Sequence, residues 1–318
     1  MTATAVDRVE RRGRSSLRPR SVKAPMDRVR RNIFWPFVAP ALIVMIAFYL
    51  LPIVFVFWLS LNKWAGFGPM RFVGLDNYRA IAADPTFHTA IGNTFKILFI
   101  AGGATFLIAF LLTLVLRQMA GKLFARSVLF FPNIINAAVF AVFAGVLFNP
   151  EGLVNILLRS VGVTDPPKWL APENQFGVIL AVLSWSASGY FCSIIMSAVD
   201  QIPPYYYEAA ALDGAGPIRQ FFTVTLPLSW EVVSVCAVMW TMSSVKVFEL
   251  ILVFGGTRAP TPPKENWTTA MYVYLEAFQG SGGRQFGVAA AAALVSLVLV
   301  VVLTFIVRRL LRRETVEL

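Results

Sequence analysis

The chain has 318 residues, of which 57% are hydrophobic and only 14% are charged. Soluble globular domains carry about 25% charged residues, so this composition excludes an ordinary soluble domain and indicates a chain that is mostly surrounded by lipid. The formal net charge of +11 comes largely from the first 31 residues and says little about function.

Six apolar runs are long enough to cross a bilayer core, which needs about 20 apolar residues in a helix. Backbone N–H and C=O groups in lipid have to be satisfied within their own segment, so each run is predicted to be a helix. The predicted fold class is therefore an all-α integral membrane protein with six transmembrane helices. The runs are Trp35–Leu61, Asn93–Leu116, Ser127–Phe148, Phe176–Val199, Trp230–Phe254 and Phe286–Val307.

A basic tail precedes the first run and decides the orientation. The run is too long for a signal peptide and no small-residue cleavage site follows it, so we expect a retained membrane helix. Eighteen Lys and Arg residues fall in the tail, in the loops after runs two and four and at the C-terminus, against eight in the opposite loops. Excess Lys and Arg marks the cytoplasmic side, so both termini are predicted to be cytoplasmic. The tail could also bind nucleic acid, but orientation and anionic lipid headgroups are the favoured explanation, and no nucleic-acid partner is expected.

The residues that most often hold metals or form disulfides are scarce. Cys192 and Cys236 lie inside the fourth and fifth runs, where they are predicted to be small apolar fillers, with a disulfide between them as the alternative. His88 is the single histidine of the chain, so no histidine-cluster metal site is expected.

The loop between the fourth and fifth runs is predicted to fold into two short helices. Pro203 and Pro204 stand at its entrance, where a missing backbone N–H costs least. Glu208 is placed in the first turn of the first helix, where the helix dipole favours an anion. Gly214 to Pro217 then end that helix and begin the second. A slim alanine-rich helix with an acidic end suits insertion into a groove of a partner, and an ordinary connecting loop is the plainer alternative.

The order of residues in this loop resembles the EAA loop of permease subunits in bacterial ABC importers. The family pattern is Glu-Ala-Ala, then Asp-Gly-Ala, then Leu-Pro, and in that family the loop is the coupling helix that docks on the ATPase subunit. A proline often follows the Leu-Pro by four residues, where this chain has Glu231, which is a departure at the start of the fifth run. The matching positions, to which the resemblance assigns ATPase coupling, are Glu208, Ala209, Ala210, Asp213, Gly214, Ala215, Leu226 and Pro227.

The resemblance covers roughly Phe34 to Arg309. In detail, the chain is similar to the maltose-type carbohydrate uptake permeases, specifically to the first of their two membrane subunits. The outer loops are short, so no large folded insertion is present, and this departs from the maltose protein itself. The further matches are Phe72–Tyr78, Phe130–Asn133, Gly152–Asn155 and the stretch from Gly282 to Ala290.

The resemblance implies a type I ABC importer transmembrane domain that moves a sugar of the di- or oligosaccharide class into the cytoplasm by alternating access. It implies a bacterial cell-membrane location and four kinds of partner besides lipid. These partners are a second permease subunit of similar fold that completes a heterodimer, two ATPase subunits, an extracytoplasmic solute-binding protein, and the sugar.

The chain lacks the motifs of an ATPase or of another enzyme. Gly121-Lys122 is not preceded by the first glycine of a G-x-x-x-x-G-K-[ST] loop and is followed by Leu123, so ATP hydrolysis is assigned to a partner, and no cofactor is expected. The predicted organisation is a basic cytoplasmic tail at 1–34, a first helix with its outer loop at 35–85, a permease core at 86–310 that contains the coupling loop at 200–228, and a cytoplasmic tail at 311–318.

Polar and aromatic residues of the fourth and fifth runs are candidates for the substrate pathway. Lys246 and Glu249 are three apart on the predicted fifth helix, so they share a face, where they either pair structurally or line the pathway. Sugars are bound by hydroxyl groups and aromatic rings, and the resemblance places Tyr190, Ser243 and Ser244 at sugar-contacting positions. Helix packing is the plainer explanation for any one of these residues. The candidates are Ser184, Trp185, Ser188, Tyr190, Trp240, Ser243, Ser244, Lys246 and Glu249.

Two other transporter classes remain open. An ABC importer for another solute, such as glycerol phosphate or a polyamine, would share the coupling loop, and a phosphorylated substrate would favour more basic residues in the pathway. A secondary transporter would couple to an ion gradient without an ATPase and would often show inverted repeats, of which the sequence gives no clear sign.

Overall fold

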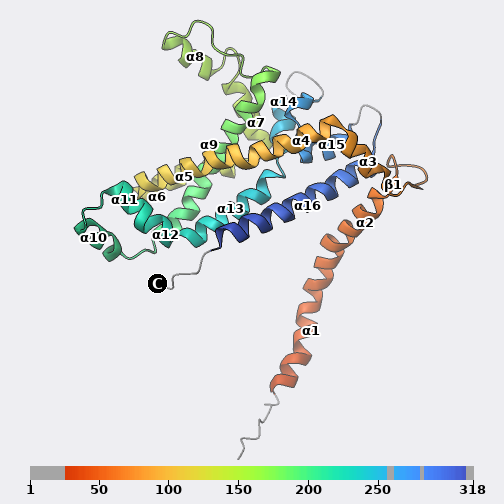
Figure 1. The fold of residues 1–318 in the computed structure, drawn as a ribbon, viewed down its shortest axis with the longest axis horizontal. Helices are drawn as coiled ribbons and strands as arrows, with labels where there is room; N and C mark the ends of the chain where they lie inside the picture. Colours follow the sequence, from red (N-terminus) through yellow and green to blue (C-terminus); the bar gives the residue numbers. More distant parts are fainter. Residues whose placement is uncertain (1–25, 256–260, 280–282, 313–318) are drawn as a thin grey trace, which may run out of the picture. The chain divides into compact units, whose positions relative to one another are not determined.

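A computed structural model of the chain describes residues 26–255, 261–279 and 283–312. Its elements are nearly all helices, which confirms the all-α class (Figure 1). The described residues also include a two-stranded antiparallel ribbon of β1 (Asn62–Lys63) and β2 (Arg71–Phe72). This ribbon lies in the first predicted outer loop and leaves the fold class unchanged.

The chain divides into two units, residues 1–54 and 55–318. The described part of the first unit holds α1 (Met26–Met45), the π-helical turn η1 (Ile46–Leu50) and the start of α2 (Leu51–Ser60). A candidate span runs over Phe34–Ser60 and coincides with the predicted first helix. Almost none of its residues are buried, which is typical of a helix that is apolar all round and is covered by lipid.

Three further spans in the second unit confirm the predicted second, fourth and sixth helices. The second begins earlier than predicted because the Asp84 side chain accepts a hydrogen bond from the backbone N of Thr86 at 2.8 Å and so caps the helix. The three spans are Pro85–Arg117, made of α4 (Pro85–Lys96), η2 (Ile97–Ala101) and α5 (Gly102–Arg117); α9 (Pro172–Val199); and α16 (Phe286–Leu311).

The prediction of one continuous helix over Ser127–Phe148 is wrong. The segment forms a pair, α6 (Lys122–Ile134) and α7 (Ala137–Leu147), bent by 98°. Pro132 removes a backbone donor near the end of α6, and Asn136 caps α7 by accepting a hydrogen bond from the backbone N of Ala138 at 2.9 Å. Hydropathy measures the length of an apolar run and not its direction, so the bend was not foreseen.

The fifth predicted helix is also interrupted. Helix α13 (Trp230–Ser244) ends in a turn, and α14 (Glu249–Gly255) begins after it. The Thr268 hydroxyl donates to the carbonyl oxygen of Val247 at 2.6 Å and so satisfies one backbone acceptor that the break releases. Non-helical backbone at membrane depth is tolerated only inside protein or beside a water-filled cavity, so this break is a feature of the site.

Helix α9 is central to the second unit, because α5, α6 and α13 all pack against it (Figure 1). Glycines permit the closest approaches. A Cβ on Gly189 of α9 would overlap the carbonyl oxygen of Leu129 on α6, and a Cβ on Gly102 of α5 would overlap the indole of Trp240. The Trp240 indole N–H donates to the carbonyl oxygen of Leu98 at 2.9 Å. Such close packing and interhelical hydrogen bonding hold helices together in lipid.

The two cysteines fill this packing as predicted. Cys192 and Cys236 are buried and free, and the Thr113 hydroxyl lies 3.7 Å from the Cys192 sulfur. The alternative of a disulfide between them is therefore wrong in this structure.

Short elements gather around the N-terminal ends of α4 and α16, and Asp84 joins two of them. The Tyr272 hydroxyl of α15 donates to the Asp84 carboxylate at 2.8 Å. Burial raises the pKa of Asp84, but hydrogen bonds from Tyr272 and Thr86 outweigh it, and the net pKa lies below its ordinary value. The elements are α3 (Asp76–Ala83), η4 (Lys264–Asn266) and α15 (Thr269–Phe278); α8 (Leu153–Ser160) follows α7.

Replacing Tyr272 with phenylalanine is expected to destabilise this contact by about 1 kcal/mol at neutral pH, because the carboxylate loses a hydrogen bond. A carboxylate with a depressed pKa contributes stability above its unfolded pKa and loses it as pH falls through the folded pKa. The difference from wild type should therefore shrink below about pH 4, which thermal unfolding in detergent at several pH values would measure. Tyr274→Phe is the control, because the Tyr274 hydroxyl makes no hydrogen bond to any residue that the structure describes.

Candidate functional site

The coupling loop, residues 200–228, contains the two short helices predicted on either side of Gly214. Pro204 and Pro217 each occupy the first turn of their helix, where a backbone N–H has no intrahelical partner. Glu208 lies in the second turn of the first helix and not in the first as predicted, because the helix already begins at Pro204. The elements are α10 (Pro204–Leu212), α11 (Pro217–Gln220), the π-helical turn η3 (Phe221–Thr225) and α12 (Leu226–Leu228).

Gly214 closes α10 in a conformation that needs glycine. Its φ is +75°, in the left-handed region that side chains disfavour. The backbone N of Gly214 donates to Ala211 O at 2.9 Å, and that of Ala215 donates to Ala210 O at 2.9 Å. These two bonds are the pair that defines a Schellman C-cap, so the glycine fixes the angle at which α10 meets α11.

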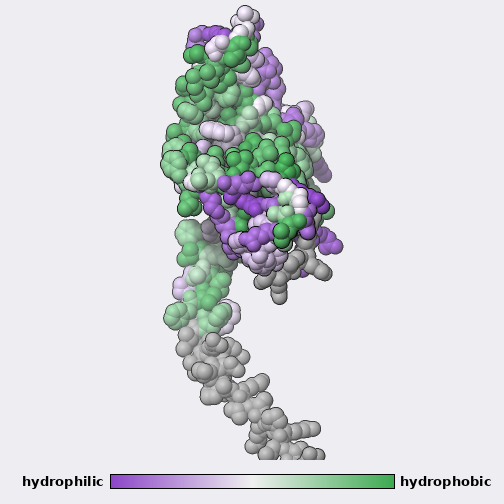
Figure 2. Space-filling model, turned by 90° about the vertical axis from the view of Figure 1, so that its left-hand side faces the viewer, coloured by the Kyte–Doolittle hydropathy of each residue, from purple (hydrophilic) through white to green (hydrophobic). Residues whose placement is uncertain are grey.

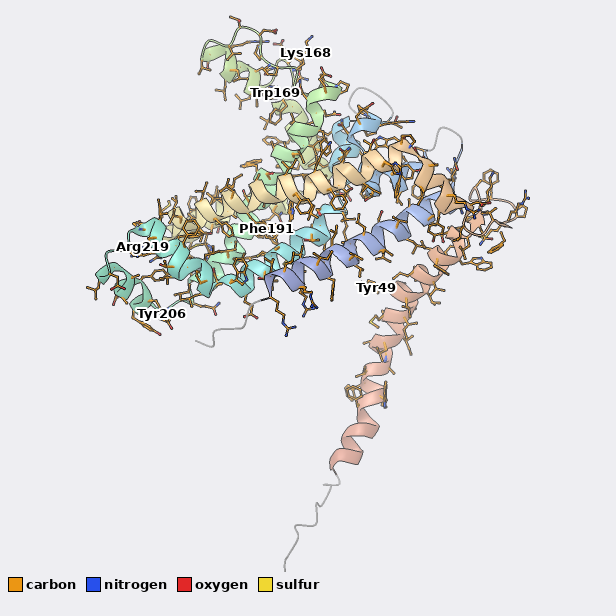
Figure 3. All side chains as sticks on the ribbon, in the orientation of Figure 1. Tyr49, Lys168, Trp169, Phe191, Tyr206 and Arg219 are labelled. Carbon is orange, nitrogen blue, oxygen red and sulfur yellow. The ribbon has the colours of Figure 1, made fainter. Side chains whose placement is uncertain are left out.

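The outward surface of the coupling loop is exposed and partly apolar. Figure 2 looks at this end of the second unit and shows hydrophilic residues gathered between apolar surfaces. Figure 3 places Tyr206 on α10 and Arg219 on α11 at the same end. Of the residues in the family pattern, Glu208, Ala209, Asp213, Gly214 and Pro227 are exposed, Ala210 and Leu226 are half-buried, and Ala215 is buried. Large apolar side chains that stay exposed beside them are Tyr205, Leu212, Ile218 and Phe222.

The inner side of the loop is attached to the membrane helices. The Arg117 guanidinium of α5 stacks 3.3 Å from the centre of the Tyr207 ring and donates to the Gln220 side chain at 3.3 Å. The Tyr207 hydroxyl lies 3.2 Å from the Thr225 hydroxyl. One arginine therefore contacts both short helices of the loop.

The loop ends at a sharp corner. The segment Pro217–Leu228 meets α13 at an angle of 76°, with Ser229 between them. The Trp230 indole N–H donates to the carbonyl oxygen of Leu311 at 2.8 Å, so the start of α13 is tied to the end of α16.

Four of the predicted pathway residues are buried in helix contacts. The Ser184 hydroxyl is 2.7 Å from Leu180 O and 3.2 Å from Ala101 O, and the Ser188 and Ser244 hydroxyls donate within their own helices. Trp240 packs against α5 as described above. These contacts are those of interhelical packing, and the pathway role of the four remains a prediction.

The other predicted pathway residues reach the surface. Trp185 is 50% exposed and stacks on Phe140 of α7 with ring centres 5.6 Å apart, and Tyr190 is half-buried. Ser243, Lys246 and Glu249 are exposed at the break between α13 and α14. We use the name break face for these three residues together with Trp185, which lies on α9, the helix that packs against both α13 and α14.

Of the two alternatives for Lys246 and Glu249, the structural pair is not seen at the break. Lys246 and Glu249 show no ion pair in the part of the chain that the structure describes, because the helix on which the spacing of three would bring them together is interrupted. Instead, Lys246 follows the C-terminus of α13 and Glu249 begins α14. A cation at a helix C-terminus and an anion at an N-terminus are each favoured by the helix dipole.

A family comparison decides what this arrangement belongs to. The family described as "Binding-protein-dependent transport system inner membrane component" matches residues 153–316, which include α9, the coupling loop, both halves of the broken span and α16. The chain belongs to this family. It is therefore a transport permease, a multi-pass component of the membrane, and the resemblance drawn from its motifs is confirmed.

Several relatives are similar over most of the permease. A probable ABC transporter permease protein, YurN of Bacillus subtilis, is 33% identical over 84% of this chain and 92% of its own. The trehalose/maltose transport system permease protein MalF of Thermococcus litoralis is 27% identical, covering 85% and 90%. The sn-glycerol-3-phosphate permease protein UgpA of Escherichia coli O157:H7 is 31% identical, covering 84% and 90%.

A solved structure supports the fold of the permease. A chain of a bacterial ABC transporter that imports the acidic polysaccharide alginate has a TM-score of 0.77, covering 92% of this chain and 99% of its own. Its sequence identity is 22%, so the likeness confirms the type I importer fold alone.

Sequence reasoning missed the residues that attach the permease's coupling loop. Arg117 and Tyr207 are 90 positions apart, and each has an ordinary local explanation, as a basic residue at a helix end and as one of three consecutive tyrosines. The exposure of Leu212 and Ile218 was equally unpredictable, because an apolar residue in a largely apolar chain gives no sign of whether it faces the surface.

Proposed function

We propose that this permease moves a sugar of the di- or oligosaccharide class into the cytoplasm by alternating access, driven by a separate ATPase through the coupling loop. The observation that carries the proposal is the coupling loop itself, whose inner side is tied to α5 through Arg117 and whose outer side exposes Glu208 beside apolar side chains. An exposed apolar patch rimmed by polar groups is typical of a docking surface.

The proposed assembly has four protein partners. A second permease subunit of similar fold completes a heterodimer, two ATPase subunits dock on the coupling loops, and an extracytoplasmic binding protein delivers the sugar. The subunit is non-catalytic and holds no cofactor. The basic residues place both termini and the coupling loop in the cytoplasm of a bacterial cell.

The proposed organisation follows from this topology. Residues 1–34 are a basic cytoplasmic tail, 35–85 the first helix with its outer loop, 86–310 the permease core with the coupling loop at 200–228, and 311–318 a cytoplasmic tail.

The break face supplies the proposed sugar contacts. Trp185 presents an exposed ring, and Ser243 presents an exposed hydroxyl at the end of α13. Aromatic rings and hydroxyl groups are the side chains that bind sugar rings and sugar hydroxyls. The trehalose/maltose relative supports this class of substrate. The shape of the pathway is proposed to depend on the packing of the helices that carry these contacts. The buried residues in that packing are Ser184, Ser188, Trp240 and Ser244.

A second candidate substrate class is a small phosphorylated polyol. Lys246 is an exposed cation on the break face, and a relative is a permease for sn-glycerol 3-phosphate. An ammonium group at this position would attract a phosphate as a point charge.

Replacing Lys246 with glutamine separates these two classes. For a neutral sugar we expect the KM of uptake to change by less than about threefold, because an exposed charge contributes little to binding a neutral ligand. For sn-glycerol 3-phosphate the same change would raise KM by roughly tenfold or more, because a charge-assisted hydrogen bond is lost. Uptake of labelled trehalose, maltose and sn-glycerol 3-phosphate into proteoliposomes that hold the whole importer would measure this.

The matched control is Lys96→Gln on α4. Lys96 is also an exposed lysine in a membrane span, but its ammonium group lies 5.5 Å from the centre of the Phe176 ring and donates to the Asn93 side chain at 3.2 Å. A tenfold rise in the KM for sn-glycerol 3-phosphate in Lys246→Gln, together with no transport of trehalose or maltose, would overturn the sugar proposal. The substrate would then be a small phosphorylated polyol.

A further inference from the structure

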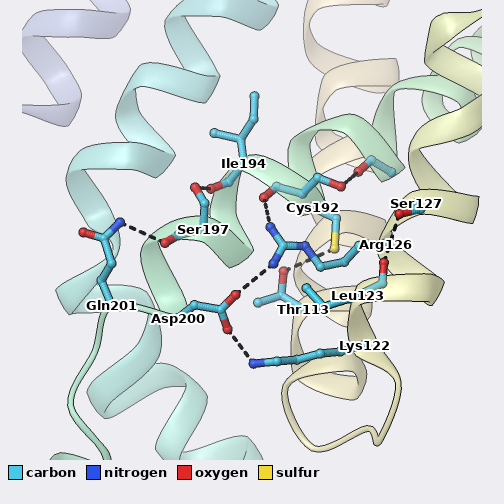
Figure 4. A network of polar contacts seen from close by, with 12 residues as sticks. Thr113, Lys122, Leu123, Arg126, Ser127, Cys192, Ile194, Ser197, Asp200 and Gln201 are labelled. Carbon is cyan, nitrogen blue, oxygen red and sulfur yellow. Dashed lines mark hydrogen bonds and ion pairs between the residues drawn. The ribbon is translucent and has the colours of Figure 1, made fainter.

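A cluster of charges joins the entrance of the coupling loop to α6 (Figure 4). One Asp200 oxygen is 2.7 Å from the Lys122 ammonium, and the other is 2.8 Å from the Arg126 guanidinium. Arg126 also donates to the carbonyl oxygen of Ser193 on α9 at 2.8 Å. The Arg126 side chain is 18% exposed, so this ion pair is partly shielded from water.

Two of the three charges in this cluster are unfavourable in their own helices. Asp200 stands at the C-terminus of α9, where the helix dipole disfavours an anion, and Lys122 begins α6, where it disfavours a cation. Local helix capping therefore cannot explain these residues. Their pairing across two helices can, because each charge offsets the local cost of the other.

A cavity lies beside the charge cluster. Its volume is about 360 Å³, and its walls include Arg117, Lys122, Asp200, Tyr207 and Glu208. It is bordered by α10 on one side and by the ends of α5 and α6 on the other, next to the contact between Arg117 and Tyr207. The loop entrance is thus held by Asp200, and α10 is held at Tyr207 with open space beside that contact.

Helix α6 leads from the cluster to the break face. It packs along α9 and turns through the 98° bend into α7. Helix α7 in turn packs against α14, whose first residue is Glu249, and its Phe140 ring stacks on Trp185. The contacts are continuous from the loop entrance to Trp185 and to α14.

We infer that Lys122, Arg126 and Asp200 form an ionic clamp that positions the coupling loop on α6 and passes its movement to the bent pair α6–α7. The clamp residues are positioning residues and touch neither sugar nor nucleotide. The inference rests on the proposed function in one respect, namely that the coupling loop moves when the ATPase closes.

The test uses the complete importer in lipid nanodiscs, with Cys192 and Cys236 replaced by alanine and spin labels at Leu123 on α6 and Gln201 beyond the clamp, both exposed. Dipolar coupling reports the label separation at rest and after trapping with ATP and vanadate. In the intact clamp we expect one separation in both states. In Asp200→Asn we expect a second, longer separation after trapping, and a roughly three- to tenfold rise in ATP hydrolysed per trehalose or maltose transported.

Two further variants show whether loss of the clamp's ion pairs causes the second separation in Asp200→Asn. Exchanging all three charges, with Asp200→Arg, Arg126→Asp and Lys122→Glu together, should restore the single separation and lower the amount of ATP hydrolysed per sugar transported. Asp76→Asn breaks an exposed ion pair with Arg79 elsewhere in the same unit and should leave both readouts unchanged. A single unchanged separation in Asp200→Asn, or a failure of that variant to assemble with its partners, would overturn the inference in favour of a purely structural ion pair. The proposed function is tested separately by Gly214→Val. This substitution is expected to lower substrate-stimulated ATP hydrolysis whether or not the clamp transmits movement.

Discussion

Replacing Gly189 with alanine is expected to destabilise the folded permease by about 1–3 kcal/mol or more and to reduce the assembled importer in the membrane. The added Cβ would overlap the backbone carbonyl of Leu129, which cannot rotate away as a flexible side chain could. Helices α6 and α9 would have to separate, and the Asp200 clamp lies along the same interface. Chemical or thermal unfolding of the purified permease in mixed micelles would measure the loss.

The matched control is Gly177→Ala, because Gly177 is in the same helix and a Cβ there meets no atom within 4 Å. Alanine is favoured over glycine within a helix by roughly 1 kcal/mol, so this variant should be neutral or slightly more stable. The two substitutions therefore have opposite expected signs. Equal effects would show that α6 and α9 do not approach as closely as the structure has them.

Hydropathy located the membrane segments well where the helix is straight. Phe176–Val199 was predicted and falls within α9, because a run of apolar residues without interior breakers has one stable form in lipid. The bent pair α6–α7 was missed although its signals were present. Pro132 and Asn136 are a helix breaker and a helix cap four residues apart, but the hydropathy of an apolar run gives no weight to their positions.

The charges of the fifth run show how one local error changes a site. A spacing of three makes Lys246 and Glu249 neighbours only if the helix is continuous between them. The break at residues 245–248 removes that condition, and each charge then meets the helix terminus that suits it. Thr268, whose hydroxyl donates to Val247 O in the break, is 21 residues away, so a contact that stabilises the break is not visible in the local sequence.

Pathway residues could not be sorted from packing residues by sequence. In a soluble helix, polarity divides the buried face from the exposed one, but in lipid both faces are apolar and a serine fits either. Ser184 and Ser243 look alike in sequence, yet the first is buried between helices and the second is exposed at the break. The coupling loop escaped this ambiguity, because its glycine and prolines have positional meaning that does not depend on what surrounds the loop.

Replacing Gly214 with valine is expected to lower sugar uptake and substrate-stimulated ATP hydrolysis more than tenfold. A branched side chain at φ +75° costs about 1–3 kcal/mol, and the Schellman bonds that fix α10 against α11 would break in favour of a relaxed turn. The coupling loop would then present Glu208 and Leu212 to the ATPase at the wrong angle. Gly214 lies outside the candidate spans, so the amount of permease in the membrane should stay close to that of wild type.

The strain explanation makes a graded prediction. Asparagine tolerates the left-handed region better than other side chains, so Gly214→Asn should retain more uptake than Gly214→Val. Gly216→Val tests crowding alone, because Gly216 has a φ of −70° and, like Gly214, an open space where a Cβ would stand. We expect near-normal transport from Gly216→Val. Full uptake by Gly214→Val would mean that the loop does not couple ATP hydrolysis to transport, and a gradient-driven transporter would become the better account of this permease.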